Sequence, residues 1–512
     1  MLASHYLSAY EASAEGPEAD ALAAQARLAL RGAAERAAGL GGHDQAVAYL
    51  EQALGVATDP GDRADLLERA AASAVAAARY EPAEAYARRA IEAWRDAGDP
   101  RSADRATGLL GTVLIDGSKL AEATRVLEAA LEGLPQRGAG EEVEAVLLAH
   151  LSRALMRSAS YPRSVEVADQ ALALAERLNL DQIVAEAFVN KGSSLDFLGR
   201  RRESAAIQQV ALVLARAGGW ITTELRAANN LSVALAGDEP RRANEILREG
   251  VALGRRVGNR GMTAWLAGSL GYYAYLTGDD WDGALAVVEE VLFWPIGPAD
   301  RARELGAATQ IRVARGEPAQ PLMDELDALA KGLSDPQLLS GYEAIRAEVA
   351  LTTGDPVGAY RAASRALEII PEFASWVSPI AMRAAIWAGN EEEARTSAQR
   401  LDVMPQSDAT IQTHRSWATA AVAALAGRRD DAIPGFRRAL ASFRELRRDF
   451  ELARVALDMV HLLGPDEPEA RAAAEEARAI FERLGARPDL ERLEVALAAS
   501  PAHAALPVAQ SR

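Results

Sequence analysis

The sequence predicts an all-α solenoid, in which pairs of short helices stack side by side, and three observations indicate it. Apolar residues recur with i, i+3, i+4 spacing over residues 110–114 and 120–131, on either side of a turn at Gly117-Ser118. The same two-helix pattern then repeats along the chain at an interval of about 40 residues. Ala, Leu and Arg are abundant and runs of Val, Ile and Thr are sparse, which favours helices over strands.

The second helix of each pair begins its packed face with a small residue, so the two helices can approach closely. Turns that contain Gly, Pro or an acidic residue precede most of these helices, as expected where one helix ends and the next begins. The small residues are Ala46, Ala83, Ala123, Ser164, Ser204, Ala243, Ala284, Ala359, Ala394, Ala432 and Ala473.

The unit over residues 110–135 resembles a tetratricopeptide repeat, which has a Leu-Gly pair, an Ala, a bulky residue, a second Ala and a final Pro. The matching residues are Leu110-Gly111, Ala123, Leu127, Ala130 and Pro135. The resemblance implies tetratricopeptide-like helical hairpins, roughly eleven or twelve of them, that form a right-handed superhelix with a concave groove. Because the usual unit is about 34 residues, we expect helices that are longer by a turn or more.

A run of prolines interrupts the repeat, and Pro inside a helix costs about 3 kcal/mol, so these residues mark helix boundaries. We expect an N-terminal array over residues 1–295, a degenerate repeat over 296–340, a C-terminal array with a capping helix over 341–499, and a disordered tail over 500–512. The degenerate repeat either bends the array or stacks as a divergent unit, and we favour the second interpretation. The prolines are Pro295, Pro298, Pro318, Pro321 and Pro336.

Within the degenerate repeat, the residues between the prolines predict one short helical pair. Its two helices are expected over residues 300–314 and 322–331. A further helical pair is expected at the end of the chain, where Gly485 and Pro488 form a turn.

The composition excludes several classes of function. The net charge of −17 opposes non-specific nucleic-acid binding, which requires a positive field. The chain has no Cys, so disulfides and thiolate metal sites are excluded. Neither a signal peptide nor an uncharged apolar run of about 18 residues is present, so we expect a cytoplasmic protein that does not span a membrane.

Catalytic motifs are absent from the sequence. No Gly is followed directly by Lys, as the phosphate-binding Gly-x-x-x-x-Gly-Lys loop requires, and the six His residues never pair at the spacing of a zinc hydrolase. The segment Gly268-Ser269-Leu270-Gly271 is one residue short of a nucleophile elbow and fits helix packing better. We therefore expect a chain that is not an enzyme and that has no cofactor and no metal site.

Polar residues on the first helices form the first candidate site, because these helices line the concave groove. Counting from the small residue of each first helix aligns His150, Asn190 and Asn230 on adjacent units, with Arg153 nearby. Asn donates and accepts hydrogen bonds at once, which suits the backbone of an extended peptide. Tetratricopeptide proteins often use Asn on this helix in that way, so the resemblance supports a site for a protein or peptide partner. The alternative is that the Asn side chains bond neighbouring helices.

Aromatic residues form the second candidate site. Trp265, Tyr272 and Tyr275 crowd one first helix, and aromatic side chains are preferred anchors in interfaces. We predict that these three contact the partner, whereas Trp281 and Trp294 are expected to fill the core between helices. A later aromatic group consists of Trp376, Trp387 and Trp417.

Both ends of the chain resemble the C-terminal helical-repeat region of large bacterial signalling ATPases of the adenylate-cyclase or LuxR type. The segments that carry this resemblance are His5-Tyr6-Leu7, Gly16–Ala23, Ala46–Leu54 and Ala477–Pro488. The chain lacks the nucleotide loop and the cyclase catalytic region of that family, so neither ATP binding nor cyclase activity is expected here.

What the resemblance implies is a role as sensor or scaffold. The sequence therefore predicts a non-catalytic helical-repeat scaffold or sensor that binds a protein or peptide partner in its concave groove, in signalling or transcription regulation. The alternative is a detached regulatory region of an adenylate-cyclase or ATPase regulator, which senses a small ligand in the aromatic pocket.

Overall fold

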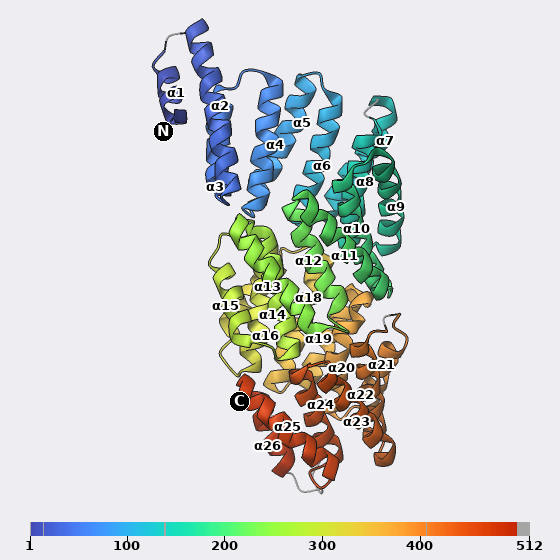
Figure 1. Ribbon diagram of the computed structural model, residues 1–512. Helices are drawn as coiled ribbons and strands as arrows, with labels where there is room; N and C mark the ends of the chain where they lie inside the picture. The colour runs from blue at the N-terminus through green and yellow to red at the C-terminus, as the bar shows by residue number, and fades with distance from the viewer. Residues whose placement is uncertain (1, 14, 138–139, 406, 499–512) are drawn as a thin grey trace.

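The computed structural model describes residues 2–13, 15–137, 140–405 and 407–498. Within these residues the chain folds into 26 α-helices and one short 3₁₀ helix, without a strand. Sequential helices pack against each other as hairpins and build the right-handed, tetratricopeptide-like superhelix that the repeat predicts (Figure 1). The predicted all-α solenoid is therefore confirmed.

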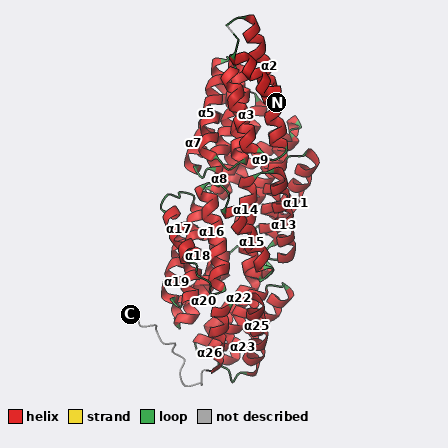
Figure 2. Cartoon of the chain, turned by 90° about the vertical axis from the view of Figure 1, so that its left-hand side faces the viewer, coloured by secondary structure: helices red, strands yellow, loops and turns green. Residues whose placement is uncertain are grey.

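The helices form two layers. From α4 to α26 each even-numbered helix contacts the next even-numbered helix as well as its sequence neighbours, so these helices form the inner, concave layer. The odd-numbered helices contact their neighbours in sequence and cover the even-numbered helices on the outside. The molecule is elongated (Figure 2).

The even-numbered helices are α2 (Pro17–Gly39), α4 (Pro60–Ala76), α6 (Pro100–Asp116), α8 (Glu141–Arg157), α10 (Asp181–Phe197), α12 (Ile221–Leu235), α14 (Arg260–Thr277), α16 (Pro298–Ala314), α18 (Pro336–Thr353), α20 (Ala374–Ala388), α22 (Ala409–Leu425), α24 (Asp449–Leu463) and α26 (Arg487–Ala498). The odd-numbered helices are α1 (Leu2–Glu11), α3 (His43–Val56), α5 (Tyr80–Asp96), α7 (Leu120–Arg137), α9 (Tyr161–Leu178), α11 (Arg201–Gly218), α13 (Pro240–Val257), α15 (Trp281–Leu292), α17 (Gln320–Ala330), α19 (Pro356–Ile369), α21 (Glu391–Asp402), α23 (Arg429–Glu445) and α25 (Pro468–Leu484). The 3₁₀ helix η1 (Pro371–Phe373) lies between α19 and α20.

The helix ends follow the predicted turn chemistry. Asp59 and Asp99 are N-caps, whose side chains accept hydrogen bonds from the backbone N–H groups of Asp62 (2.8 Å) and Ser102 (3.0 Å). A Pro takes the first helical position after each of them, where its missing N–H costs nothing. At the opposite ends, residues such as Gly278 (φ 70°) adopt the left-handed conformation that stops a helix.

The small residues predicted from the sequence lie on the outer helices and are all buried, from Ala46 at 0% exposure to Ala473 at 8%. Each lies where its helix packs against the inner helix of the same hairpin, so the repeat pattern is confirmed. On α17, Met323 takes the corresponding position, three residues after the helix begins, and is 7% exposed. This bulky residue explains why the unit over 296–340 looks degenerate in sequence.

The short helical pair predicted inside that unit is confirmed as α16 and α17, with ends that differ by one or two residues. Because α16 contacts both α14 and α18, the inner layer continues through this region. The division into arrays over 1–295 and 341–499 stays a prediction, as does a bend between them. The predicted tail over 500–512 lies outside the described residues.

Successive turns of the superhelix lie against each other. Helices whose numbers differ by ten touch: α4 with α14, α14 with α24, and α16 with α26. At the first of these contacts the backbone of Gly41 meets that of Gly258. Beside it, Arg260 on α14 pairs with Asp44 on α3 at 2.6 Å.

Further polar contacts join the turns elsewhere. The Tyr80 hydroxyl donates to the Asp300 carboxylate at 2.8 Å, and Arg201 donates to Asp408 at 2.6 Å. These partners are 220 and 207 positions apart in the sequence. The repeat pattern does not predict such contacts, since it specifies only how each hairpin packs on the next. Their consequence is that successive turns of the superhelix are held together by side chains far apart in the sequence.

None of the described helices has the length and apolar content that a bilayer crossing requires.

Candidate ligand-binding cavity

A cavity of about 290 Å³ lies inside the superhelix, enclosed by the inner helices α8, α10, α12, α14, α16, α18 and α20, with α17 and η1 contributing to its rim. Most of its wall is apolar, and the superhelical winding brings together side chains from far apart in the chain. The aromatic residues that line it are Phe197, Trp265, Tyr272, Tyr273, Tyr342, Phe373 and Trp376.

One wall of the cavity is an aromatic cluster that joins α10 to η1 and α20. Phe197 stacks on Phe373 with ring centroids 5.8 Å apart and meets Trp376 edge-on at 6.1 Å. Phe373 and Trp376 contact each other at 4.7 Å, and Tyr161 stacks on the far side of Phe197 at 4.4 Å. Because the rings support one another, this wall offers a rigid apolar surface with little rotamer entropy left to lose on binding.

The indole of Trp265 forms part of another wall, together with two arginines. The guanidinium carbons of Arg157 and Arg303 lie 4.5 and 4.6 Å from the centroid of the indole ring, within cation–π range. Both cations are neutralised, Arg157 by the buried Asp335 and Arg303 by Asp300 at 3.0 Å. This end of the cavity is therefore polar without carrying a net charge.

A chain of hydrogen bonds runs along the cavity from α14 to α10. Ser269 donates to the Asn229 amide oxygen at 2.8 Å, Asn229 donates to Asn230 at 3.1 Å, and Asn230 donates to the Ser193 hydroxyl at 2.7 Å. Gln310 on α16 also lines the cavity and is 7% exposed, yet its amide has no hydrogen-bond partner within the described ranges. That amide is available to donate to a ligand and to accept from it.

Three of the seven predicted contact residues, Asn230, Trp265 and Tyr272, line this cavity. Tyr275 does not, because it is 2% exposed and buried where α14 meets α24. Its ring stacks on Trp281 at 6.0 Å and meets Phe450 edge-on at 5.2 Å. A position three residues from Tyr272 therefore faces the next superhelical turn instead of the cavity.

His150, Arg153 and Asn190 lie on α8 and α10, further along the inner surface towards the N-terminus. Asn190 is 1% exposed; its amide donates to the Ala149 carbonyl at 2.8 Å and accepts from Arg226 at 2.5 Å. This arrangement is the one expected if the Asn side chains bond neighbouring helices.

The other two members of that group also have partners within the fold. Arg153 pairs with Asp116 on α6. The His150 ring lies 3.1 Å from the Thr112 hydroxyl, and burial lowers its pKa, so the ring is neutral at pH 7.

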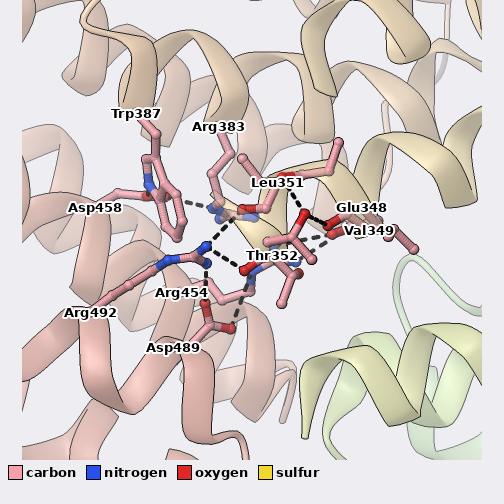
Figure 3. Close-up of polar contacts among 12 residues, drawn as sticks. Glu348, Val349, Leu351, Thr352, Arg383, Trp387, Arg454, Asp458, Asp489 and Arg492 are labelled. Atoms are coloured by element: carbon pink, nitrogen blue, oxygen red, sulfur yellow. Dashed lines mark hydrogen bonds and ion pairs between the residues drawn. The ribbon is translucent and has the colours of Figure 1, made fainter. Parts of the chain in front are cut away.

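At the opposite end, a network of buried charges holds α24 and α26 against α18 and α20 (Figure 3). Arg454 pairs with Glu348 at 3.1 Å, and Arg383 pairs with Asp458 at 2.9 Å. Arg492 donates to the Leu351 carbonyl at 2.8 Å. Since every charge drawn here has a partner, the network closes the fold and leaves no free charge for a ligand.

A smaller space of about 60 Å³ lies between this network and the main cavity, and Tyr272, Tyr273 and Trp376 line both. It is bordered by His414, which hydrogen-bonds Glu451 at 2.9 Å. Although burial acts to raise the pKa of Glu451, Arg448 and His414 outweigh it and lower that pKa to about 2.

Sequence reasoning missed the aromatic wall as a unit. Trp376 belonged to the later aromatic group noted in the sequence, but Phe197 and Phe373 carried no signal, because nothing in the repeat pairs positions 176 residues apart. No group of three or more His, Asp and Glu side chains that could hold a metal ion occurs in the described part of the chain.

No family model and no curated protein sequence matches this chain. Among solved structures, it is similar to a Rap protein complexed with Competence and Sporulation Factor, with 12% identity and a TM-score of 0.41, over 82% of this chain and 98% of that one. It is also similar to the APC/C hetero-tetramer Cut9-Hcn1, with 12% identity and a TM-score of 0.35, over 91% of this chain and 96% of that one. Such distant likeness carries no argument about function, which rests on the cavity. The resemblance to signalling ATPases stays a prediction.

Proposed function

We propose that this chain is a non-catalytic receptor that holds a short apolar peptide segment in its central cavity. The observation that carries the proposal is the composition of the cavity wall: a rigid aromatic surface faces amides that can pair with a peptide backbone. Buried aromatic anchors supply most of the binding energy in peptide recognition, and amides fix the register of the backbone.

The contacts between turns favour an extended segment over a folded partner. Contacts such as Tyr80 with Asp300 and Arg201 with Asp408 hold successive turns together, so a globular domain could pass between the turns there only if these contacts broke. A segment of a few residues needs only one or two side chains inside a cavity of about 290 Å³. Gln310, together with the second N–H of the Asn230 amide that Ser193 does not use, would pair with its backbone.

A small apolar molecule is the second candidate ligand, and the size of the cavity favours it. Pockets for small ligands are usually about 300–1,000 Å³ and mostly apolar with a few polar groups, and this cavity lies at the lower end of that range. A role in signalling or transcription regulation would follow from either ligand, and it rests only on the resemblance of the two chain ends to signalling ATPases.

The proposal is tested by incubating the whole chain with a random-sequence hexapeptide mixture, separating bound from free peptide by size exclusion, and identifying the retained peptides by mass spectrometry. We expect peptides rich in large apolar residues to be retained. Trp376→Ala removes one anchor of the aromatic wall and should lower recovery by about tenfold or more, the loss typical of a central anchor.

Phe293→Ala is the matched control, because Phe293 is an aromatic residue that is 90% exposed and lies outside the cavity. It should recover as much peptide as the wild type. Equal recovery by both variants would show that peptides bind elsewhere. If no peptide is retained but apolar fragments of drug-like size raise the Tm of the chain, the small-molecule candidate replaces the peptide.

A further inference from the structure

Arg226 lies on the inner helix α12 and projects into the superhelix, where it is partly accessible. One of its terminal nitrogens donates to the Asn190 amide oxygen on α10 at 2.5 Å. A guanidinium has five N–H donors, and no carboxylate lies within ion-pair distance of this one in the residues that the structure describes. Most of its hydrogen-bonding capacity is therefore unused.

The other arginines of the interior differ in this respect. Every arginine that is fully buried in the described ranges pairs with a carboxylate, as a charge removed from water requires. These arginines are Arg153, Arg157, Arg383, Arg448 and Arg454, and their partners are Asp116, Asp335, Asp458, Glu451 and Glu348.

The surroundings of Arg226 do not supply the missing anion. Its charged neighbours are Arg153 and Arg157, which repel it, and Asp116 and Glu186, which attract it from beyond ion-pair distance. Asp116 is already held by Arg153, and Glu186 accepts a hydrogen bond from Gln182 at 3.1 Å. Burial and the repulsion from Arg153 lower the pKa of Arg226 to about 9, and a bound anion would reverse that shift.

Arg226 is also close to the cavity. Asn230 and Val233, which line the cavity, lie four and seven residues after Arg226 and therefore on the same face of α12. One helical turn rises about 5.4 Å, so the backbone of Arg226 lies about one turn from that of Asn230. Asn190, its hydrogen-bond partner, is likewise one turn from Ser193 at the cavity wall.

From this juxtaposition we propose that Arg226 is an anion-binding subsite of the central cavity and that the ligand carries a carboxylate next to its apolar part. The inference rests on the proposed function for the apolar part alone. A peptide with a free C-terminus and a small arylalkanoic acid share the required chemistry. In the peptide case, the last side chain occupies the aromatic cavity and the terminal carboxylate reaches Arg226.

The experiment compares the binding of each carboxylic acid probe with the binding of its uncharged amide. Random hexapeptides are offered to the full chain as free acids and as C-terminal amides, and 4-phenylbutyrate is offered beside 4-phenylbutyramide. We expect the wild type to prefer the acid forms by at least about tenfold, the usual strength of a charge-assisted hydrogen bond. Arg226→Gln should abolish that preference, and Arg226→Lys should retain most of it. Arg241→Gln, which removes the same charge from the exposed surface of α13, should behave as the wild type.

The outcomes separate this inference from the proposed function. Equal binding of acids and amides by the wild type overturns the subsite but leaves peptide binding in place. If 4-phenylbutyrate binds in a way that depends on Arg226 and no hexapeptide is retained, the subsite is supported and the proposal of a peptide ligand is rejected. No binding of any probe rejects both.

Stability distinguishes a structural role for Arg226. If Arg226 only stabilises the fold, Arg226→Gln lowers the Tm of the unliganded chain, and the subsite is then rejected. If Arg226 is instead an anion-binding residue, the Tm of unliganded Arg226→Gln equals or exceeds that of the wild type, because the substitution removes a cation that Arg153 and Arg157 repel.

Discussion

A leucine at position 341 should fill the central cavity and improve the fold at the same time. Gly341 lies inside α18 and lines the cavity, and a Cβ atom placed there would meet no atom within 4 Å. Its φ is not positive, so a larger residue is not strained. Gly341→Leu therefore adds a side chain to open space without removing any contact.

The substitution should raise the stability of the fold and lower its affinity for the ligand, and the loss of affinity should be the larger effect. Replacing Gly inside a helix adds about 0.8–1.0 kcal/mol to the stability of the folded state, because Gly has the poorest helix propensity apart from Pro. Burying a leucine side chain is worth about 1.5–3 kcal/mol, so a ligand that loses an equal apolar volume should bind roughly 10- to 150-fold more weakly. The variant should thus be more stable and bind less.

The assay measures both quantities on the same samples. Urea unfolding gives the free energy of unfolding, and titration with a retained hexapeptide gives the Kd, with Gly341→Ala as the control that gains the helix propensity but fills little space. A wild-type Kd for Gly341→Leu would refute the assignment of the ligand to this cavity. A lower free energy of unfolding for Gly341→Leu than for Gly341→Ala would refute the reasoning that the space is open.

The remaining predictions concern buried charges and the contact between turns. Burial raises the pKa of Glu304 well above its ordinary value, despite Arg303 nearby, so the wild type loses stability as the pH rises above about 4.5. The Tm of Glu304→Gln should therefore exceed that of the wild type by a margin that grows from pH 4.5 to 8. A margin that does not change with pH would contradict this. The pKa shift of Glu451 is in the opposite direction. Its folded pKa of about 2 adds about 3 kcal/mol to the free energy of unfolding above pH 4.5, and this contribution is lost as the pH falls towards 2. The Tm deficit of Glu451→Gln should therefore shrink over that interval. Gly258→Ala should open the contact with Gly41, since its Cβ would collide with that backbone, and hydrogen exchange in α3 should rise. Gly219→Ala has the same left-handed strain but no neighbour within 4 Å, and should leave α3 protected.

The sequence was sufficient for the hairpins because each hairpin depends on local spacing. The positions of Ala46 to Ala473 follow from the small residue that close helix packing requires, and the structure buries all of them. The pattern of small residues fails at Met323, where a long side chain takes the place of the small one, although α17 still forms.

The cavity could be predicted only in part. Asn230, Trp265 and Tyr272 could be predicted from the sequence because they lie on the inner faces of adjacent helices. Phe373 and Arg226 could not be predicted, since their roles depend on which helices meet after a full superhelical turn and on which charges have a partner. Those facts follow from the pitch of the superhelix, which small differences in every hairpin determine together.

The contacts between turns also fix how many hairpins the chain can contain. An open array can gain or lose a repeat by gene duplication or deletion, because each unit touches only its neighbours. Here, one added hairpin between α5 and α15 would carry Tyr80 away from Asp300 and shift every later partner out of place. Evolution of this chain should therefore proceed by substitution within units, while the number of units in each turn stays constant.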